Sequence, residues 1–471
     1  MTMPSSSPTR PPLLMVAVLF LAIAAFQVAA TMIFPALPTI SRELHAAPAA
    51  ISLSQTLFFA IGGLAAASLP LSDRFGRRRV LATVIALGTI GSILVIVSNS
   101  LPLYNVGRWL QAPGVIALPL SFLILREHVS ADRYPLYIGW LSALNLGATG
   151  VDGAVAGILT DTVGYRGIFW IAAIAGAVAL IGVLVAIPVG ALIRIGRTDW
   201  AGLATLGSGV VLFSVGLSLA GSLGWGSALT IGLLLGGLAL LTMFIVIERR
   251  TRHPLVEVRH LRTRSVISAP LVILFGMAGF MAVFAFLAPF WAQLPTSAGG
   301  FGLSATTYAL ATIPGTVLSF VLAPICGGLA RRVGWRPILV AGTVLAFLGL
   351  VGLAVCAQIA VPWFISFALV ATVFSGASMT AANGLGVLLS PRESPAFLPG
   401  IISVMFSFGS SFGSAVVGTI VAIPSPANFA IAFATAAAMM LIACGFTLLV
   451  PRPRHAMAAA TGTAPNAEAA A

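Results

Sequence analysis

Residues 13–37, LLMVAVLFLAIAAFQVAATMIFPAL, form an apolar stretch without a single charged side chain. A membrane-spanning helix needs about 20 consecutive, mostly apolar residues, so this stretch is long enough to cross a bilayer. It is too long for the core of a signal peptide, and no convincing cleavage site follows it. The stretch therefore predicts a retained transmembrane helix.

Similar stretches recur along all 471 residues, of which 59% are hydrophobic and only 7% charged. Because about a quarter of the residues in soluble domains are charged, lipid has to solvate most of this chain. The stretches lack the period-two alternation of barrel strands, which favours helices. We predict fourteen transmembrane helices, at residues 13–37, 51–71, 80–99, 103–126, 135–160, 168–190, 200–221, 228–248, 266–292, 304–329, 337–358, 362–390, 396–422 and 425–450.

The net charge is +13, and all 24 basic residues other than histidine are arginine. With the N-terminus inside, 21 of these arginines fall in cytoplasmic connectors and ends, 2 (Arg42 and Arg166) in outer connectors, and 1 (Arg108) within a predicted helix. By the positive-inside rule, this predicts a multi-pass protein of the bacterial inner (cell) membrane with both termini cytoplasmic. Topology accounts for the basic charge, which argues against nucleic-acid binding.

One motif occurs in both halves of the chain. SDRFGRRRVL (residues 72–81) and ARRVGWRPIL (residues 330–339) share the pattern Arg-x-Gly-x-Arg, and each lies between two apolar stretches on the predicted cytoplasmic side. Two halves built on one plan, with the substrate path between them, are typical of secondary transporters.

With these motifs the chain resembles the major facilitator superfamily, specifically its fourteen-helix drug:proton antiporter branch. SDRFGRRR is similar to the superfamily's motif between helices two and three, and GRWLQAPG (residues 107–114) to its Arg-x-x-Gln-Gly pattern in helix four. ILTDTVGYRGIFWI (residues 158–171) is similar to the run that joins helices five and six, and RTDWAG (residues 197–202) to the entry of helix seven.

The resemblance implies an all-α polytopic membrane protein with two six-helix bundles, helices 1–6 and 9–14, plus an extra helix pair. The expected domains are cytoplasmic tails at 1–12 and 451–471, an N-terminal bundle at 13–190, the extra pair at 200–248, a basic cytoplasmic loop at 249–265 and a C-terminal bundle at 266–450.

Two departures from the family pattern concern acidic residues. Ala29, nine residues before Pro38, stands where the family's first helix often carries an acid. In the antiporter motif of helix five, the family's Gly-Pro is replaced by Asp152-Gly153. One expected membrane acid is therefore missing, and a different one is present.

The fifth predicted helix contains ALNLGATGVDGAVAGIL (residues 143–159), which has two distinct faces. At 100° per residue, its polar residues share one face and its glycines another, where Gly153 and Gly157 form a small-xxx-small pair. The polar face consists of Asn145, Thr149 and Asp152, and the glycine face of Gly147, Gly150, Gly153 and Gly157.

Arg108 is the only basic residue within a predicted span, and its depth matches that of Asp152 to within roughly 5 Å. We expect the two to interact, directly or through water, with Asp152 as a proton site, because intramembrane charges are usually paired or line a path. The alternative is a static ion pair that orients two helices.

The remaining candidates are a gate and a substrate cavity. The resemblance implies that Asp73, with Arg74, Gly76, Arg77 and Arg78, closes the cytoplasmic side; the alternative is that these arginines only anchor the topology. The predicted cavity residues are Gln111, Asn145, Thr149, Gln27, Gln55, Phe280, Phe284 and Asn383.

We therefore expect a secondary active transporter, not an enzyme, that exports hydrophobic or cationic small molecules by alternating access and functions as a monomer. The chain has no lysine and no Walker motif, so we expect no cofactor and a proton gradient as the energy source. The main alternative keeps the fold but takes up or exchanges a specific metabolite, such as an anion bound by Arg108. A polytopic enzyme or sensor would need a soluble appendage or a polar catalytic cluster, and neither is visible.

Overall fold

The computed structural model describes residues 13–69, 71–129, 137, 141, 152–189, 199–251, 264–356, 359–389 and 397–450. Within these residues, 13 helices are long and apolar enough to cross a membrane, and each overlaps one predicted span. The fifth predicted span lies mainly outside the described residues, and its described part is helical at 152–162. The all-helical fold class is therefore confirmed, with about 14 membrane helices.

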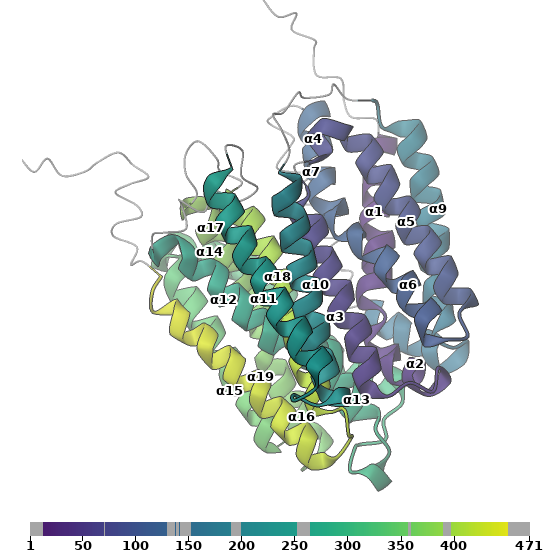
Figure 1. Cartoon of the computed structure of the whole chain (residues 1–471), viewed down its shortest axis with the longest axis vertical. Coiled ribbons are helices and arrows are strands. Elements are labelled where there is room, and N and C mark those ends of the chain that lie inside the picture. Colours follow the sequence, from purple (N-terminus) through teal and green to yellow (C-terminus); the bar gives the residue numbers. More distant parts are fainter. Residues whose placement is uncertain are drawn as a thin grey trace, which may run out of the picture.

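The first bundle contains the N-terminal helices (Figure 1), which pack closely where α5 and α1 meet α9. Its elements are α1 (Leu13–Thr31), η1 (Phe34–Ala36), α2 (Leu37–Glu43), α3 (Pro48–Ala67), α4 (Leu71–Phe75), α5 (Arg77–Val97), α6 (Leu101–Gln111), η2 (Ala112–Ile116), α7 (Ala117–His128), the helical residues 152–162 and α9 (Arg166–Ala186).

The second bundle contains the C-terminal helices, with α12 packed against α18 and α19. Its elements are α12 (Arg264–Ala282), η4 (Val283–Leu287), α13 (Ala288–Gln293), η5 (Thr296–Ala298), α14 (Ala305–Val333), α15 (Trp335–Cys356), α16 (Val361–Ala371), η6 (Phe374–Ser378), α17 (Met379–Leu389), α18 (Phe397–Ile420) and α19 (Pro426–Thr447). Both η4 and η6 are π-helical, whereas η1, η2 and η5 are 3₁₀-helical.

An extra pair, α10 (Trp200–Leu223) and α11 (Ala228–Arg250), lies along the junction of the two bundles (Figure 1). Helix α3 packs along α18 at this junction, and α10 packs against both. Hydroxyl contacts fix α10 to α18: Ser214 Oγ lies 3.1 Å from Ser411 Oγ, and Thr419 Oγ1 donates to the carbonyl of Leu217 at 2.6 Å. The pair therefore belongs to the bundle junction.

Lipid-facing surfaces are apolar, as a bilayer demands. Helix α9 exposes Ile174, Ile181 and Val185 while it buries its opposite face in the bundle. In water such a surface would be unusual, but in lipid it replaces contacts between acyl chains at little cost.

The molecule has two ends, named here after the short helices that mark them in Figure 1. At the α4 end, Gly76 joins α4 to α5 with a backbone φ of 90°, a conformation that glycine adopts without strain. At the α2 end the bundles touch, because α13 packs against α2 and η1, and α14 also packs against η1.

Candidate functional site

Arg108 is the centre of a polar cluster inside the first bundle. Its side chain, carried by α6, is fully buried. Its Nη1 donates to the carbonyl oxygen of Ala29 and to Oε1 of Gln111, each at 2.6 Å, and its Nη2 donates to Oε1 of Gln55 at 3.3 Å. All three acceptors are neutral, and within the described part of the chain no carboxylate forms a salt bridge with this guanidinium.

The end of α1 compensates part of this charge. Ala29 lies in the last turn of α1, where backbone carbonyls lack an intrahelical partner and carry the partial negative charge of the helix dipole. This is also the position at which the family resemblance leads one to expect an acid. A backbone carbonyl therefore binds the arginine in place of the missing carboxylate.

Aromatic rings cover the guanidinium. Its Cζ lies 4.3 Å from the ring centroid of Phe58 and 5.9 Å from that of Phe169, which is cation–π distance. Phe58 stacks on Phe26, with centroids 6.4 Å apart and ring planes 5° from parallel. Phe58 also belongs to an apolar cluster that includes Ala285 of η4, so the ring that covers Arg108 is part of a cluster shared by both bundles.

Asp152 forms a hydrogen bond with Oγ1 of Thr31, and the same hydroxyl lies 2.8 Å from the carbonyl oxygen of Gln27. A threonine hydroxyl has only one proton to donate. When Thr31 donates to Gln27, the proton in the contact with Asp152 has to come from a protonated carboxyl group. When Thr31 donates to Asp152, the carboxylate is ionised. The geometry is thus compatible with both protonation states of Asp152.

Arg108 and Asp152 were predicted to interact directly or through water, and among the described residues the two form no direct salt bridge. An interaction through water stays a prediction. Arg108 binds α1 at Ala29, and Asp152 binds α1 at Thr31, two residues further along. Both side chains therefore bind the same end of α1, and this helix end lies between them in the network of contacts.

The predicted cavity residues divide into two groups. Gln55 and Gln111 bind Arg108 directly, and Gln27 is buried on α1 beside Thr31. Asn145 and Thr149 lie outside the described residues.

The other predicted cavity residues belong to the second bundle. The rings of Phe280 and Phe284 are 4.4 Å apart, and Phe280 also lies 5.9 Å from Phe374. Asn383 is exposed on α17 and donates to the carbonyl of Met379 on its own helix, so the structure does not bring it to Arg108.

The arginines of the α4–α5 motif contact neighbouring helices of the first bundle. Arg77 forms a salt bridge with Glu127 of α7 at 2.9 Å, and Arg78 donates to the carbonyl of Leu184 on α9. The guanidinium of Arg74 lies 5.8 Å from the ring centroid of Phe75. The side chain of Asp73, predicted to close the gate, lies outside the described residues.

The sequence analysis missed two contacts that join the bundles at the α2 end. Asp161 Oδ2 accepts a hydrogen bond from the backbone N–H of Thr306 at 2.8 Å, at the start of α14. Gln293 Nε2 on α13 donates to the carbonyl of Pro35 at 2.8 Å. We call these two contacts the α2-end seal. The run ILTDTVGYRGIFWI had already placed Asp161 at the end of a span, but only the fold supplies its partner.

Asp161 lies just beyond the predicted fifth span, and its surroundings favour the charged form. Burial raises the pKa of its carboxyl group, but hydrogen bonds from Thr306, Ser304 and Ala305 outweigh this effect and lower the pKa below its ordinary value. Nearby, Gly157 approaches α14 so closely that a Cβ there would lie 2.7 Å from the carbonyl oxygen of Ala305. The Asp161–Thr306 contact of the α2-end seal is therefore a charge-assisted hydrogen bond that lies beside tight backbone packing.

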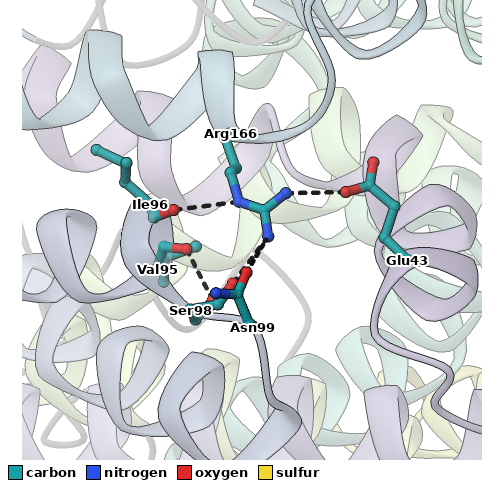
Figure 2. Close-up of polar contacts among 6 residues, drawn as sticks. All are labelled: Glu43, Val95, Ile96, Ser98, Asn99 and Arg166. Carbon is teal, nitrogen blue, oxygen red and sulfur yellow. Dashed lines mark hydrogen bonds and ion pairs between the residues drawn. The ribbon is translucent and has the colours of Figure 1, made fainter.

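Arg166 ties together three elements of the first bundle at the same end, as Figure 2 shows. It forms a salt bridge with Glu43 of α2 at 3.0 Å. On its other side it donates to the carbonyls of Ile96 and Ser98 at 3.1 and 2.8 Å, and to Oδ1 of Asn99 at 3.3 Å. Arg166, which the sequence predicts to lie in an outer connector, thus holds the ends of α2, α5 and α9 in one unit.

Solved structures of other transporters share this fold. The POT family transporter PepTSo superposes with a TM-score of 0.68 at 13% sequence identity, over 94% of this chain and 98% of that one. The nucleoside transporter NupG superposes with a TM-score of 0.65 at 12% identity, over 93% of this chain and 100% of that one. At such low identity these matches establish the architecture alone.

Sequence relatives are more informative. A uridine/deoxyuridine transporter of Lactococcus lactis subsp. cremoris is 32% identical over 84% of each chain. The multidrug resistance protein Stp of Mycobacterium tuberculosis is 27% identical over 78% of this chain and 68% of its own length. The model of the Major Facilitator Superfamily matches residues 19–195, 200–414 and 290–469. The chain is therefore a membrane transporter that belongs to the Major Facilitator Superfamily.

Proposed function

We propose that this transporter carries a planar, polar metabolite of the nucleoside class across a bacterial cell membrane, coupled to protons, by alternating access. The observation that carries the proposal is the environment of Arg108. Among the described residues this buried guanidinium binds neutral acceptors only, and it lies beside a phenyl ring that stacks on a second one.

The charge of Arg108 argues for the class of substrate. In a low-dielectric interior, a buried cation without a carboxylate repels a cationic ligand and attracts carbonyl or anionic oxygens. Gln55 supplies hydrogen bonding, and the Phe26–Phe58 pair supplies flat apolar surface, which together suit the polar edge and the ring of a nucleobase. The Lactococcus relative, named for uridine and deoxyuridine, supports the same class. We therefore favour uptake or exchange of a specific metabolite over multidrug efflux.

The hydrogen bonds of Asp152 support a role in proton coupling. Its partner Thr31 has one proton for two neighbours, so protonation of Asp152 switches the direction of the Thr31 hydroxyl. Because Arg108 binds the same end of α1, this switch acts two residues from the arginine's carbonyl partner. In this proposal the proton site and the substrate site communicate through α1.

The distribution of arginines along the chain supports one orientation of the transporter in the membrane. We propose that the α4 end and both termini face the cytoplasm, and that the α2 end faces outward. Residues 13–190 and 266–450 would rock as two bundles of one monomer. The α2-end seal would close the outer side, and Asp73 with the arginines of its motif would close the cytoplasmic side in the opposite state.

Efflux of hydrophobic compounds is the second candidate, and one feature favours it. Phe280, Phe284 and Phe374 form an aromatic cluster in the second bundle, which offers the adaptable apolar surface of a promiscuous binder. The 27% identity to the Mycobacterium multidrug resistance protein is in line with this function.

Counterflow in proteoliposomes separates the two candidates. Vesicles loaded with unlabelled uridine should take up tritiated uridine from outside without any ion gradient, and external tetraphenylphosphonium should not compete. Arg108→Lys keeps the charge but loses the fork that binds three acceptors, so its counterflow should fall by about tenfold at equal reconstitution. Absence of uridine counterflow, together with carriage of tetraphenylphosphonium, would refute the nucleoside proposal in favour of efflux.

A further inference from the structure

The amide of Gln55 can take only one orientation in this site. An arginine guanidinium donates hydrogen bonds and accepts none, so Gln55 has to present its oxygen to Nη2 of Arg108. The amide nitrogen, with its two N–H donors, then points away from the arginine. This Nε2 is buried and has no hydrogen-bond partner among the described residues.

Gln111 provides an internal comparison. It also presents its oxygen to Arg108, but its Nε2 donates to Oγ of Ser92 at 2.9 Å. Both ends of the Gln111 amide are therefore satisfied within the bundle. Of the two glutamines bound to Arg108, only Gln55 has an amide nitrogen without any hydrogen-bond partner among the described residues.

A second unused donor lies in the same cluster, since Nε of Arg108 is also buried and has no hydrogen-bond partner in the part of the chain that the structure describes. Gln55 is three residues before Phe58 on α3, which places both on one helix face, and Phe58 belongs to the same apolar cluster as Ala285 of the second bundle. Unpartnered donors next to the bundle junction, around a buried cation, call for a ligand that brings acceptors.

We infer that Gln55 is a specificity-determining residue that selects substrates with a carbonyl acceptor and rejects those with an amino donor at the contacted position. The inference rests on the proposed nucleoside function. Uridine and cytidine nearly share one shape, but the carbonyl oxygen at position 4 of uracil is an amino group in cytosine. An amide whose N–H groups face the substrate can donate to the carbonyl oxygen of uracil. Opposite cytosine, the amide N–H and the amino group are both donors, and neither has an acceptor.

The experiment measures the ratio of uridine to cytidine counterflow in proteoliposomes at equal pH on both sides. The wild type should prefer uridine by about tenfold, because an unsatisfied buried donor is costly. Gln55→Glu replaces the donors by an acceptor, so the ratio should fall by about tenfold or invert. Gln55→Met removes hydrogen bonding altogether, and its ratio should approach one.

Gln111→Glu is the matched control, because it changes the other amide bound to Arg108 without touching the unused donors. Its rate is expected to drop, but its uridine to cytidine ratio should stay within about twofold of the wild type. If the wild type carries uridine and the ratio is unchanged in both Gln55 variants, the inference is overturned and the proposed function stands. If the wild type carries neither nucleoside, the proposed function fails, and the inference with it.

Discussion

At the scale of single residues, Arg108 shows how neutral oxygens stabilise a buried cation that pairs with no carboxylate among the described residues. Three neutral oxygens bind the guanidinium, and one of them belongs to the last turn of α1. Charge-assisted hydrogen bonds of this kind are stronger than neutral ones, and the helix end adds a fixed partial negative charge. These contacts therefore stabilise the charged form of the guanidinium inside the bundle.

Asp152→Asn tests the proton role of the fifth helix. Asparagine keeps the size of the side chain and can still bond to Thr31, but it cannot gain or lose a proton. We expect the variant to fold and to exchange uridine in counterflow at a rate within about threefold of the wild type, since the shell of Arg108 is untouched. Accumulation driven by a pH gradient should disappear. Near-normal gradient-driven accumulation would show that the proton binds elsewhere.

At the scale of elements, the sequence predicts where helices lie far better than how they are wound. Apolar runs of about 20 residues place the spans because lipid excludes other backbone structures. The same runs say nothing of the π-helical segments η4 and η6, whose hydrogen-bond pattern depends on packing between helices. Phe280 and Phe374, from the two helices that contain these segments, are in ring contact, and this pairing is a property of the fold.

Gly153 and Gly157 form a matched pair for testing the approach of the fifth helix to α14. A Cβ at Gly157 would lie 2.8 Å from Cα of Thr306, whereas a Cβ at Gly153 would meet nothing within 4 Å. Gly157→Ala should push α14 away and raise the reactivity of a cysteine placed at Ala305, which is buried against Gly157, toward a membrane-impermeant thiol reagent, with the native cysteines replaced. Gly153→Ala should leave it unchanged. Equal reactivity in both variants would contradict close packing at Gly157.

Asp161→Asn tests the contact between Asp161 and Thr306 in the α2-end seal. The folded pKa of Asp161 is lowered, so the ionised group stabilises the seal at neutral pH, and this contribution is lost only as the pH falls through the lowered pKa. Loss of the charged cap of α14 should destabilise the state in which the α2 end is closed by about 1 kcal/mol. The equilibrium between the transporter states should then shift away from that state by about fivefold. Spin-label distances across the α2 end would report this shift, which should persist between about pH 5 and 8 because the ordinary carboxyl pKa lies below this range. A distance distribution identical to that of the wild type would remove Asp161 from the seal.

At the scale of the whole molecule, the architecture was largely predictable, and the pairing of side chains was not. Repeated arginine motifs and long apolar runs indicate two bundles, and Arg108 and Asp152 stand out because charges inside lipid are costly. Equal depth on neighbouring helices, however, led us to expect an interaction between them, directly or through water, and the described residues do not include the direct form. The depth of a residue in the membrane does not determine how its helix is rotated about its own axis. The carbonyls without an intrahelical partner at the end of α1 cannot be recognised before that end is located.

The helix contacts at the bundle junction, like the pairing of side chains, could not be predicted from the sequence. Helix α10 contacts α3 and α18 at once, so the extra pair lies where any relative motion of the bundles has to pass. Hydropathy identifies the pair, but only the packing of Ser214 and Thr419 shows which helices it touches.

The most direct test of the account is the proton movement that uridine itself causes. Proteoliposomes containing the purified protein and an internal pH-sensitive dye, with no initial gradient, should register a pH change when uridine is added outside. The change should vanish in Asp152→Asn while that variant still exchanges labelled uridine. Uridine transport by the wild type without any proton movement would contradict the central claim that Asp152 and Arg108 couple the two through the end of α1.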